Sequence, residues 1–201
     1  MASHGYTYLI KSFIHQLPKE AVPSIIEVGV DRGVMWLPLV VFLARTRPKF
    51  LAIGVDILVQ EQVSLMLQHF DLSPEQQAYL IESNSLEVLP KMVDQGMQFD
   101  VVLLDGDHNY HTVKHEMEHL NDLTTTSGIV VIDDCEGRWA NRDLFYSERP
   151  GYENVSIATP RIDTDKHGVR PAVHEWLAAN QNWQMSQPIP GEAVLLMRKV
   201  S

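Results

Sequence analysis

Short apolar runs that alternate with longer amphipathic stretches constrain the fold of this chain more than any other feature of its sequence. The runs are rich in β-branched residues and mostly continuous, which is typical of strands covered on both faces. They span residues 24–29, 50–56, 99–105 and 128–134, and stretches with helical spacing lie at 60–70, 85–93 and 110–120. This alternation predicts an α/β fold with a doubly wound, Rossmann-like sheet.

The C-terminal part of the chain breaks this alternation. A helix is predicted over residues 169–179 and two strands at 183–187 and 193–199. The Pro- and Gly-containing turn at 188–191 requires these strands to pair as an antiparallel hairpin. With a weaker edge strand at 77–82, we expect about seven strands, mostly parallel.

A chain of 201 residues corresponds to a single domain. Within residues 1–201 we expect an N-terminal helical segment at 1–22 and a long loop at 136–166. Connections of this length are commonly functional lids. The loop carries Arg138, Arg142 and Arg149, so we expect it to cover an anionic or sugar-like substrate; a solvated loop is the alternative.

Charge, apolar run length and cysteine content argue against several classes of protein. The formal net charge is −10, which disfavours nucleic acid as the main partner. The longest apolar run, Val34–Ala44, is read as a buried helix, because a membrane span needs about 20 residues. The single cysteine, Cys135, and the lack of an apolar leader after Met1 predict a cytoplasmic protein with a buried thiol.

Polar or small residues follow each predicted parallel strand. They include Glu27, Gly29, Gly33, Asp56, Asn84, Asp105, Asp133 and Asp134. Each alone could be a turn residue or a helix cap. Because ligands of open parallel sheets bind beyond the carboxyl ends of the strands, five polar strand ends together favour a binding site at one rim of the sheet.

The loop after the first strand favours one class of cofactor. It contains Gly29 and Gly33 but not the Gly-x-Gly-x-x-Gly pattern of dinucleotide-binding loops, and the chain has no Walker loop. The carboxylate of Glu27 would repel a pyrophosphate and suits a ligand with a cationic amino group. These features favour S-adenosylmethionine (SAM) over NAD or ATP.

At these positions the chain resembles a known family. The segments that carry the resemblance are Glu27–Gly33, Asp56, Asn84–Pro90, Leu104–Tyr110, Asp133–Asp134 and Gly168–Val173. They are similar to the motifs of small class I SAM-dependent methyltransferases. The most similar group is methyltransferase family 24, which includes macrocin O-methyltransferase-like and cephalosporin-hydroxylase-like proteins.

The resemblance implies a set of cofactor-binding residues. They are Glu27, Gly29, Asp31, Gly33, Asp56, Asn84, Ser85 and Asp105. The loop from Glu27 to Gly33 would hold the methionine end of SAM, Asp56 the ribose hydroxyls, and Asn84 with Ser85 the adenine edge. Two positions depart from the family pattern, because Asp31 stands where many members have glycine and Asn84 where an acid is common.

Three carboxylates are expected to meet at the ends of two neighbouring strands, which are about 4.8 Å apart. Asp105 follows one strand, and Asp133 and Asp134 follow the next. Such carboxylates repel one another unless a cation neutralises them or one is protonated. Oxygen ligands suit Mg²⁺ or another hard divalent cation, and the matching positions in related metal-dependent O-methyltransferases are metal ligands. The alternative is an Asp-Asp turn that caps backbone amides.

His108 lies three residues after Asp105, where sugar-modifying relatives carry a histidine that is read as a general base. An imidazole there can take the proton that a hydroxyl loses during attack on a methyl group; a helix cap is the alternative. Three further histidines, His111, His115 and His119, lie opposite the apolar stripe of their helix and are expected to face solvent.

These features predict a SAM-dependent, divalent-metal-assisted O-methyltransferase that acts on a small hydroxylated molecule, a sugar or an aromatic compound, with Asp105 and His108 as catalytic residues. One alternative is a SAM-binding protein of the same fold with another role. The other, a nucleic-acid methyltransferase, is disfavoured because residues 105–108 read Asp-Gly-Asp-His and not Asn/Asp-Pro-Pro-Tyr/Phe. The sequence leaves open whether the chain forms a homodimer.

Overall fold

The computed structural model describes residues 6–186 and 193–198. The strands are β1 (Ser24–Val28), β2 (Phe50–Asp56), β3 (Gln76–Glu82), β4 (Phe99–Leu104), β5 (Thr124–Ile132), β6 (Trp183–Met185) and β7 (Val194–Arg198). The helices are α1 (Tyr6–Gln16), α2 (Trp36–Thr46), α3 (Glu61–Gln68), α4 (Ser85–Asp94), α5 (Tyr110–Met117), α6 (Leu120–Leu123), α7 (Val169–Ala179) and a 3₁₀ turn, η1 (Tyr146–Glu148).

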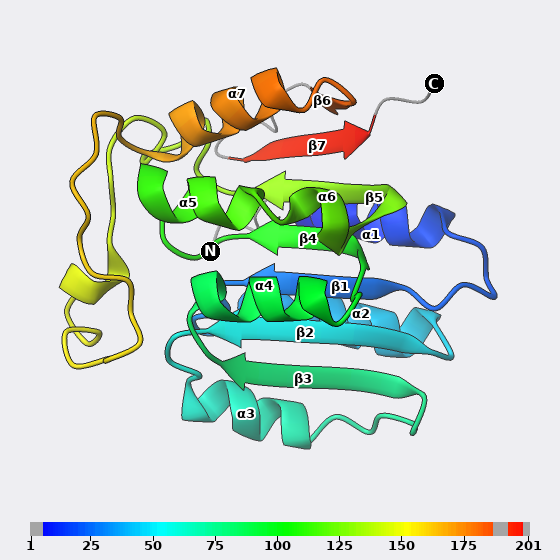
Figure 1. Ribbon diagram of the computed structural model, residues 1–201. Coiled ribbons are helices and arrows are strands. Elements are labelled where there is room, and N and C mark those ends of the chain that lie inside the picture. The colour runs from blue at the N-terminus through cyan, green and yellow to red at the C-terminus, as the bar shows by residue number, and fades with distance from the viewer. Residues whose placement is uncertain (1–5, 187–192, 199–201) are drawn as a thin grey trace.

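Within the described residues, seven strands form one sheet in the order β3-β2-β1-β4-β5-β7-β6 (Figure 1). Strands β1 to β5 pair in parallel, and β7 pairs antiparallel with both β5 and β6. The predicted fold class is therefore confirmed, including the C-terminal antiparallel pair. The turn predicted at 188–191 lies outside the described residues.

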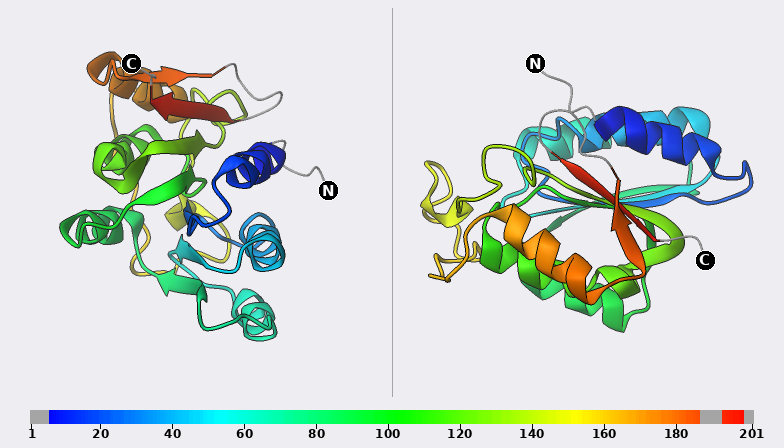
Figure 2. Two further views of the ribbon diagram at one scale, coloured as in Figure 1. Left: turned by 90° about the vertical axis from the view of Figure 1, so that its right-hand side faces the viewer. Right: turned by 90° about the horizontal axis from the view of Figure 1, so that it is seen from above.

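Helices cover both faces of the sheet, with α1, α2 and α3 on one side and α4, α5 and α7 on the other (Figure 2). Successive strand residues point to opposite faces, so Ile25 packs in the core that contains Trp36 of α2, and Ile26 packs in the core that contains Leu89 of α4. Burial on both faces explains why the strands are continuous apolar runs.

The strand order reverses between β1 and β4. Ligands of doubly wound sheets bind at such a switch point, beyond the carboxyl ends of the strands. The loop 136–166 lies at this end of the sheet, beyond the arrowheads of the parallel strands (Figure 1). The topology therefore places a candidate site beside the carboxyl ends of β1 and β4.

Two elements differ from the sequence prediction. The helix predicted over 110–120 ends at Met117, and the separate turn α6 brings both Leu120 and Leu123 into the core. Strand β5 begins at Thr124 and not at residue 128, because a run of β-branched threonines favours extended structure. Among the described helices, none is long and apolar enough to cross a membrane.

Candidate functional site

The carboxyl ends of the central strands meet at one point on the rim of the sheet. The strand register pairs Val28 with Leu104, and Leu104 with Ile132. The ladder continues one residue further, because Asp105 N–H donates to the Val28 carbonyl at 2.8 Å and Asp133 N–H donates to the Leu104 carbonyl at 3.0 Å. The structure thus brings the ends of β1, β4 and β5 together.

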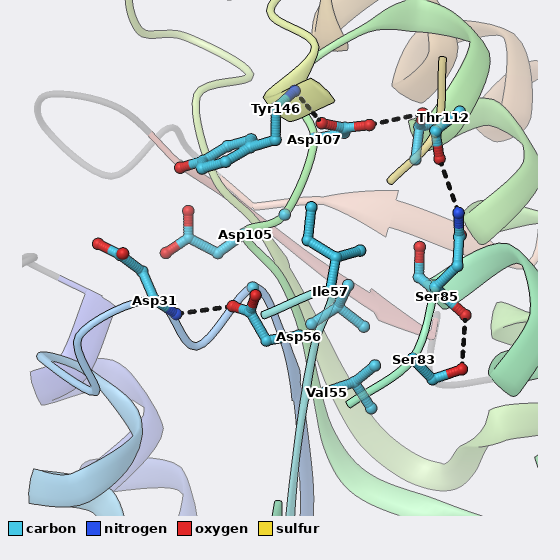
Figure 3. Close-up of a pocket in the computed structure, with 15 residues that line it drawn as sticks. Asp31, Val55, Asp56, Ile57, Ser83, Ser85, Asp105, Asp107, Thr112 and Tyr146 are labelled. Atoms are coloured by element: carbon cyan, nitrogen blue, oxygen red, sulfur yellow. Dashed lines mark hydrogen bonds between the residues drawn. The ribbon is translucent and has the colours of Figure 1, made fainter. Parts of the chain in front are cut away.

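A cavity opens at this rim, at the carboxyl ends of the strands where ligands of such sheets bind. Six predicted cofactor residues line it: Gly29, Asp31, Asp56, Asn84, Ser85 and Asp105. Figure 3 shows the carboxylates of Asp31, Asp56 and Asp105 on one side of the cavity and Ser83 and Ser85 on the other. Asp107, Thr112, Tyr146 and Thr159 also line it. None was predicted as a cofactor residue, although Tyr146 and Thr159 belong to the loop 136–166 that was expected to cover the substrate.

Two predicted cofactor residues lie outside this lining. A Cβ at Gly33 would come within 2.8 Å of the Leu37 side chain and 3.1 Å of the Val63 side chain, so close packing explains this glycine. Glu27 is only 2% exposed, and burial, followed by the charges of Asp56 and Asp133, raises its pKa well above the usual value. Its Oε2 has no hydrogen-bond partner among the described residues.

Asp56 fixes the turn that follows β1. Its Oδ2 accepts the backbone N–H of Asp31 at 2.8 Å, and its Oδ1 accepts that of Leu58 at 2.9 Å. Asp31 adopts a left-handed conformation with φ +43°, which is the backbone geometry that favours glycine. Because each carboxylate oxygen has a second lone pair, Asp56 can still accept hydrogen bonds from a ligand.

Asn84 has two structural tasks besides lining the cavity. Its side-chain oxygen accepts the backbone N–H of Leu86 at 2.9 Å and so caps α4. Its Nδ2 donates to the Ile157 carbonyl at 2.8 Å and to Thr159 Oγ1 at 3.0 Å. The helix-cap reading of Asn84 is therefore confirmed, and the same side chain also ties the long loop to the rim of the sheet.

Asp105, His108 and Asp133 form the core of the site. One ligand atom from each lies within 4.8 Å of the other two, a spacing that suits a metal ion. Burial, and then the charge of Asp133, raises the pKa of Asp105 well above its usual value. Asp133 is 6% exposed, and its Oδ1 has no hydrogen-bond partner in the described part of the chain.

Asp134 lies next to this cluster but outside it. His108 Nε2 is 3.8 Å from Asp105 Oδ1 and 3.9 Å from Asp134 Oδ2, so it faces both carboxylates. Burial lowers the pKa of His108, although the charges of Asp133 and Asp134 oppose that shift. The structure therefore groups two of the three predicted metal ligands with the predicted base and places the third, Asp134, against that base.

Tyr6, from α1, is a site residue that sequence reasoning missed. Its hydroxyl donates to Asp105 Oδ2 at 3.2 Å, across a sequence separation of 99 residues. Its side chain is 1% exposed. No local pattern identifies such a residue, because the contact depends on how α1 packs across the sheet.

The loop 136–166 is held against the rim by several cavity residues. Asp107 Oδ1 accepts the backbone N–H of Tyr146 at 2.7 Å, and the Tyr152 hydroxyl donates to Asp31 Oδ1 at 3.1 Å. The backbone carbonyl of His108 accepts the N–H of Leu144 at 3.0 Å. The loop therefore contributes Tyr146 directly to the wall of the cavity.

Three arginines of this loop stack on aromatic rings. Arg138 and Arg142 lie 4.9 and 4.8 Å from the centre of the Trp139 ring. Arg149 lies 4.7 Å from the centre of the Tyr146 ring, and its side chain is exposed. Of the three, Arg149 is the one whose aromatic partner, Tyr146, lines the cavity.

Other sequence predictions concern residues away from the cavity. His111, His115 and His119 are partly exposed, as expected for a solvent-facing row, and the candidate metal-ligand cluster found among the described residues does not include them. Cys135 is buried, and burial raises the pKa of its thiol to about 12. A thiol with this pKa is inert, which confirms the prediction.

Glu116 of α5 is a buried acid outside the metal-ligand cluster. It is 1% exposed, and burial raises its pKa to about 8. The folded protein therefore keeps this proton at pH values where the unfolded chain has lost it, so the stability due to the protonated group falls as the pH rises from about 4.5 to about 8.

Glu116→Gln is expected to remove this pH dependence. The free energy of unfolding of the variant, relative to wild type, should rise by roughly 3–4 kcal/mol between pH 5 and pH 8. Urea unfolding at pH 5, 6.5 and 8 measures this difference. The exposed Glu87 provides the control, since Glu87→Gln should show no such trend, and parallel pH profiles for wild type and Glu116→Gln would contradict the prediction.

Comparison with a protein-family model gives one match. The model of methyltransferase family 24, described as a methyltransferase domain, matches residues 26–135. This range contains strands β2 to β5, the last three residues of β1 and the candidate ligands Asp105, Asp133 and Asp134. A comparison with curated protein sequences gave no match.

Several solved structures share the fold. NovP, an O-methyltransferase, is 17% identical, with a TM-score of 0.66 over 98% of this chain and 80% of its own. CalS11, described as a TDP-rhamnose 3'-O-methyltransferase, is 15% identical, with a TM-score of 0.60 over 97% and 79%. MycE, from the mycinamycin biosynthetic pathway and in complex with Mg and SAH, is 15% identical, with a TM-score of 0.60 over 98% and 50%. The chain thus spans about half the length of MycE.

Proposed function

The chain belongs to methyltransferase family 24, and we propose that it transfers the methyl group of SAM to a hydroxyl oxygen of a small molecule with the help of a divalent cation. The observation that carries this proposal is the cluster of Asp105, His108 and Asp133 beside a cavity lined by Asp31 and Asp56. The similar fold of MycE, in complex with Mg and S-adenosylhomocysteine (SAH), supports both assignments.

We assign the cofactor to the cavity at the switch point. Gly29 and Asp31 would hold the methionine end, Asp56 would accept hydrogen bonds from the ribose hydroxyls, and Ser85 with Asn84 would border the adenine. When bound, SAM supplies a methyl group made electrophilic by its sulfonium charge. The nearby carboxylates favour this positive charge, and the phosphate groups of NAD or ATP would be repelled.

The residues at the rim fit a divalent cation. The buried Asp133 Oδ1 has no hydrogen-bond partner within the described residues, and the charge of Asp133 contributes to raising the pKa of both Glu27 and Asp105. A cation would remove that repulsion. Asp105 and Asp133 would hold it, with Asp134 beside them, since hard cations prefer oxygen ligands. There it would lower the pKa of the acceptor hydroxyl.

His108 is assigned as the general base. Burial lowers its pKa, so the imidazole is neutral near pH 7 and Nε2 can accept the proton of the acceptor hydroxyl. The carboxylates of Asp105 and Asp134, at 3.8 and 3.9 Å from Nε2, then stabilise the imidazolium. General-base catalysis of this kind contributes about 10²–10⁴-fold to the rate.

The acceptor is assigned to the space between the carboxylate cluster and the loop 136–166. Tyr146 forms part of the cavity wall, and the exposed Arg149 stacks on its ring. An aromatic ring beside a cation suits a hydroxylated sugar or aromatic compound. The description of CalS11 as a TDP-rhamnose 3'-O-methyltransferase supports a sugar. The loop acts as the lid over this acceptor.

Ligand stabilisation tests the cofactor assignment. SAH at about 100 times its Kd should add about 2.7 kcal/mol to the free energy of unfolding, a Tm increase of about 5–10 °C for a chain of this size. NAD and ATP should give no increase. Asp56→Asn should lose most of the SAH effect, because it removes the charge that holds the ribose, whereas Asp71→Asn, at an exposed position, should keep it.

Transfer of labelled methyl from SAM to a panel of hydroxylated sugars and aromatic compounds, with Mg²⁺ and with EDTA, tests the reaction itself. We expect transfer to an oxygen that EDTA abolishes. A chain that is stabilised by neither SAM nor SAH would overturn the proposed function.

A further inference from the structure

We propose that Tyr6 is a positioning residue for Asp105: its hydroxyl holds the carboxylate in the orientation that binds the divalent cation. This inference rests on the proposed function, because the cation is part of it. It adds the N-terminal helix α1 to a cluster whose members otherwise follow β4 and β5.

The two oxygens of Asp105 face different partners. Oδ2 accepts the hydrogen bond from the Tyr6 hydroxyl at 3.2 Å, and Oδ1 lies 3.8 Å from His108 Nε2. A hydrogen bond on one oxygen stops the carboxylate from rotating about its terminal torsion, which is otherwise broad and two-fold. Tyr6 therefore keeps Oδ1 directed at His108, a member of the cluster.

The position of Tyr6 is itself rigid. Tyr6, Ile10 and Ile14 form the buried stripe of α1, and each is 1% exposed or less. This stripe packs on the sheet in the core that also contains Trp36 of α2. The neighbouring Thr7 bonds through Oγ1 to Met35 Sδ at 3.2 Å. A donor fixed by core packing can fix its acceptor in turn.

A tyrosine suits this position better than a basic residue would. A tyrosine phenol ordinarily ionises at about pH 10, so Tyr6 is protonated at neutral pH and can donate to Asp105 Oδ2. Because the donor is neutral, it orients Asp105 without cancelling the negative charge that attracts a cation. A lysine or arginine at this position would neutralise Asp105 and repel the cation.

Removing a hydrogen-bond partner of a metal ligand typically weakens metal binding by about 10–100-fold. Tyr6→Phe removes the hydroxyl and keeps the ring that packs in the core. Tyr8→Phe removes the same group from the same helix at a position that is 76% exposed. The two variants therefore form a matched pair that differs in contact with Asp105.

The test is titration of Mn²⁺ into the full chain and both variants by calorimetry, with SAH affinity in EDTA and urea unfolding measured in parallel. We expect Tyr6→Phe to raise the Mn²⁺ Kd by about 10–100-fold, with SAH affinity within about twofold of wild type, and Tyr8→Phe to change neither.

Each other outcome overturns a defined statement. An unchanged Mn²⁺ Kd for Tyr6→Phe overturns the positioning role and leaves the proposed function standing. An equal loss of SAH and Mn²⁺ affinity also overturns it, because Tyr6 would then support the fold of the whole rim. A wild-type chain that binds neither Mn²⁺ nor Mg²⁺ overturns both the inference and the metal assignment.

Discussion

Asp133→Asn is expected to reduce methyl transfer by about 10³-fold at saturating Mg²⁺. The substitution removes one of the carboxylates that converge on the cluster, and metal-ion catalysis supplies several kcal/mol of rate acceleration, with each 1.36 kcal/mol worth a factor of ten. The asparagine amide keeps the size of the side chain but lacks its charge. Initial rates with labelled SAM, as a function of Mg²⁺ concentration, measure the effect.

The same variant is expected to be at least as stable as wild type in the absence of metal. Asp133 is buried and raises the pKa of both Glu27 and Asp105, so its removal relieves repulsion among the acids. Urea unfolding in EDTA therefore separates lost catalysis from lost structure. Activity and stability should move in opposite directions.

Asp94 provides the control for this substitution. It lies at the exposed end of α4, and Asp94→Asn should leave both activity and stability within about twofold and about 0.5 kcal/mol of wild type. If Asp133→Asn kept more than a tenth of the wild-type rate, the charge of Asp133 would not be required to hold a catalytic cation.

Gly29→Ala is expected to cost more than about 4 kcal/mol in the free energy of unfolding. Gly29 has φ +89°, and a Cβ there would lie 2.0 Å from the carbonyl oxygen of Asp105 and 2.6 Å from the backbone nitrogen of Gly106. Both atoms are backbone, so relief requires β1 and β4 to separate at the rim. SAH binding should be lost along with stability.

Gly96→Ala measures the part of this cost that comes from the left-handed backbone alone. Gly96 also has positive φ, +68°, but a Cβ there meets nothing within 4 Å. The left-handed backbone alone costs about 1–2 kcal/mol, which is what we expect for this variant in urea unfolding. Similar losses for the two variants would show that the chain relaxes around residue 29 and that close approach of the loops is not required.

Much of the fold could be predicted because its signals are local. The apolar run at Phe50–Asp56 and the amphipathic stretch at Val169–Ala179 coincide with β2 and α7. Boundaries were less predictable where two signals compete. The threonines at the start of β5 favour a strand but are polar, and the stripe over 110–120 continues across a break between α5 and α6 that periodicity does not show.

The candidate site was predictable as far as strand ends define it. Asp105 and Asp133 meet because they follow neighbouring parallel strands, which the alternation of elements predicts. One role of Asn84 was predictable, because a helix cap is a local feature. Its hydrogen bonds to Ile157 and Thr159 were not, because they join residues far apart in the sequence.

The amino-acid sequence by itself determined the class of fold, the acidic rim and the absence of a phosphate-binding loop, because these follow from residue types at short spacing. Only the tertiary structure decided which acid faces His108, that Gly33 packs against α2 and α3 and not against the cavity, and that Tyr6 reaches Asp105. Such contacts join residues far apart in the chain, and they depend on the angle and register at which whole elements pack, which no local pattern encodes.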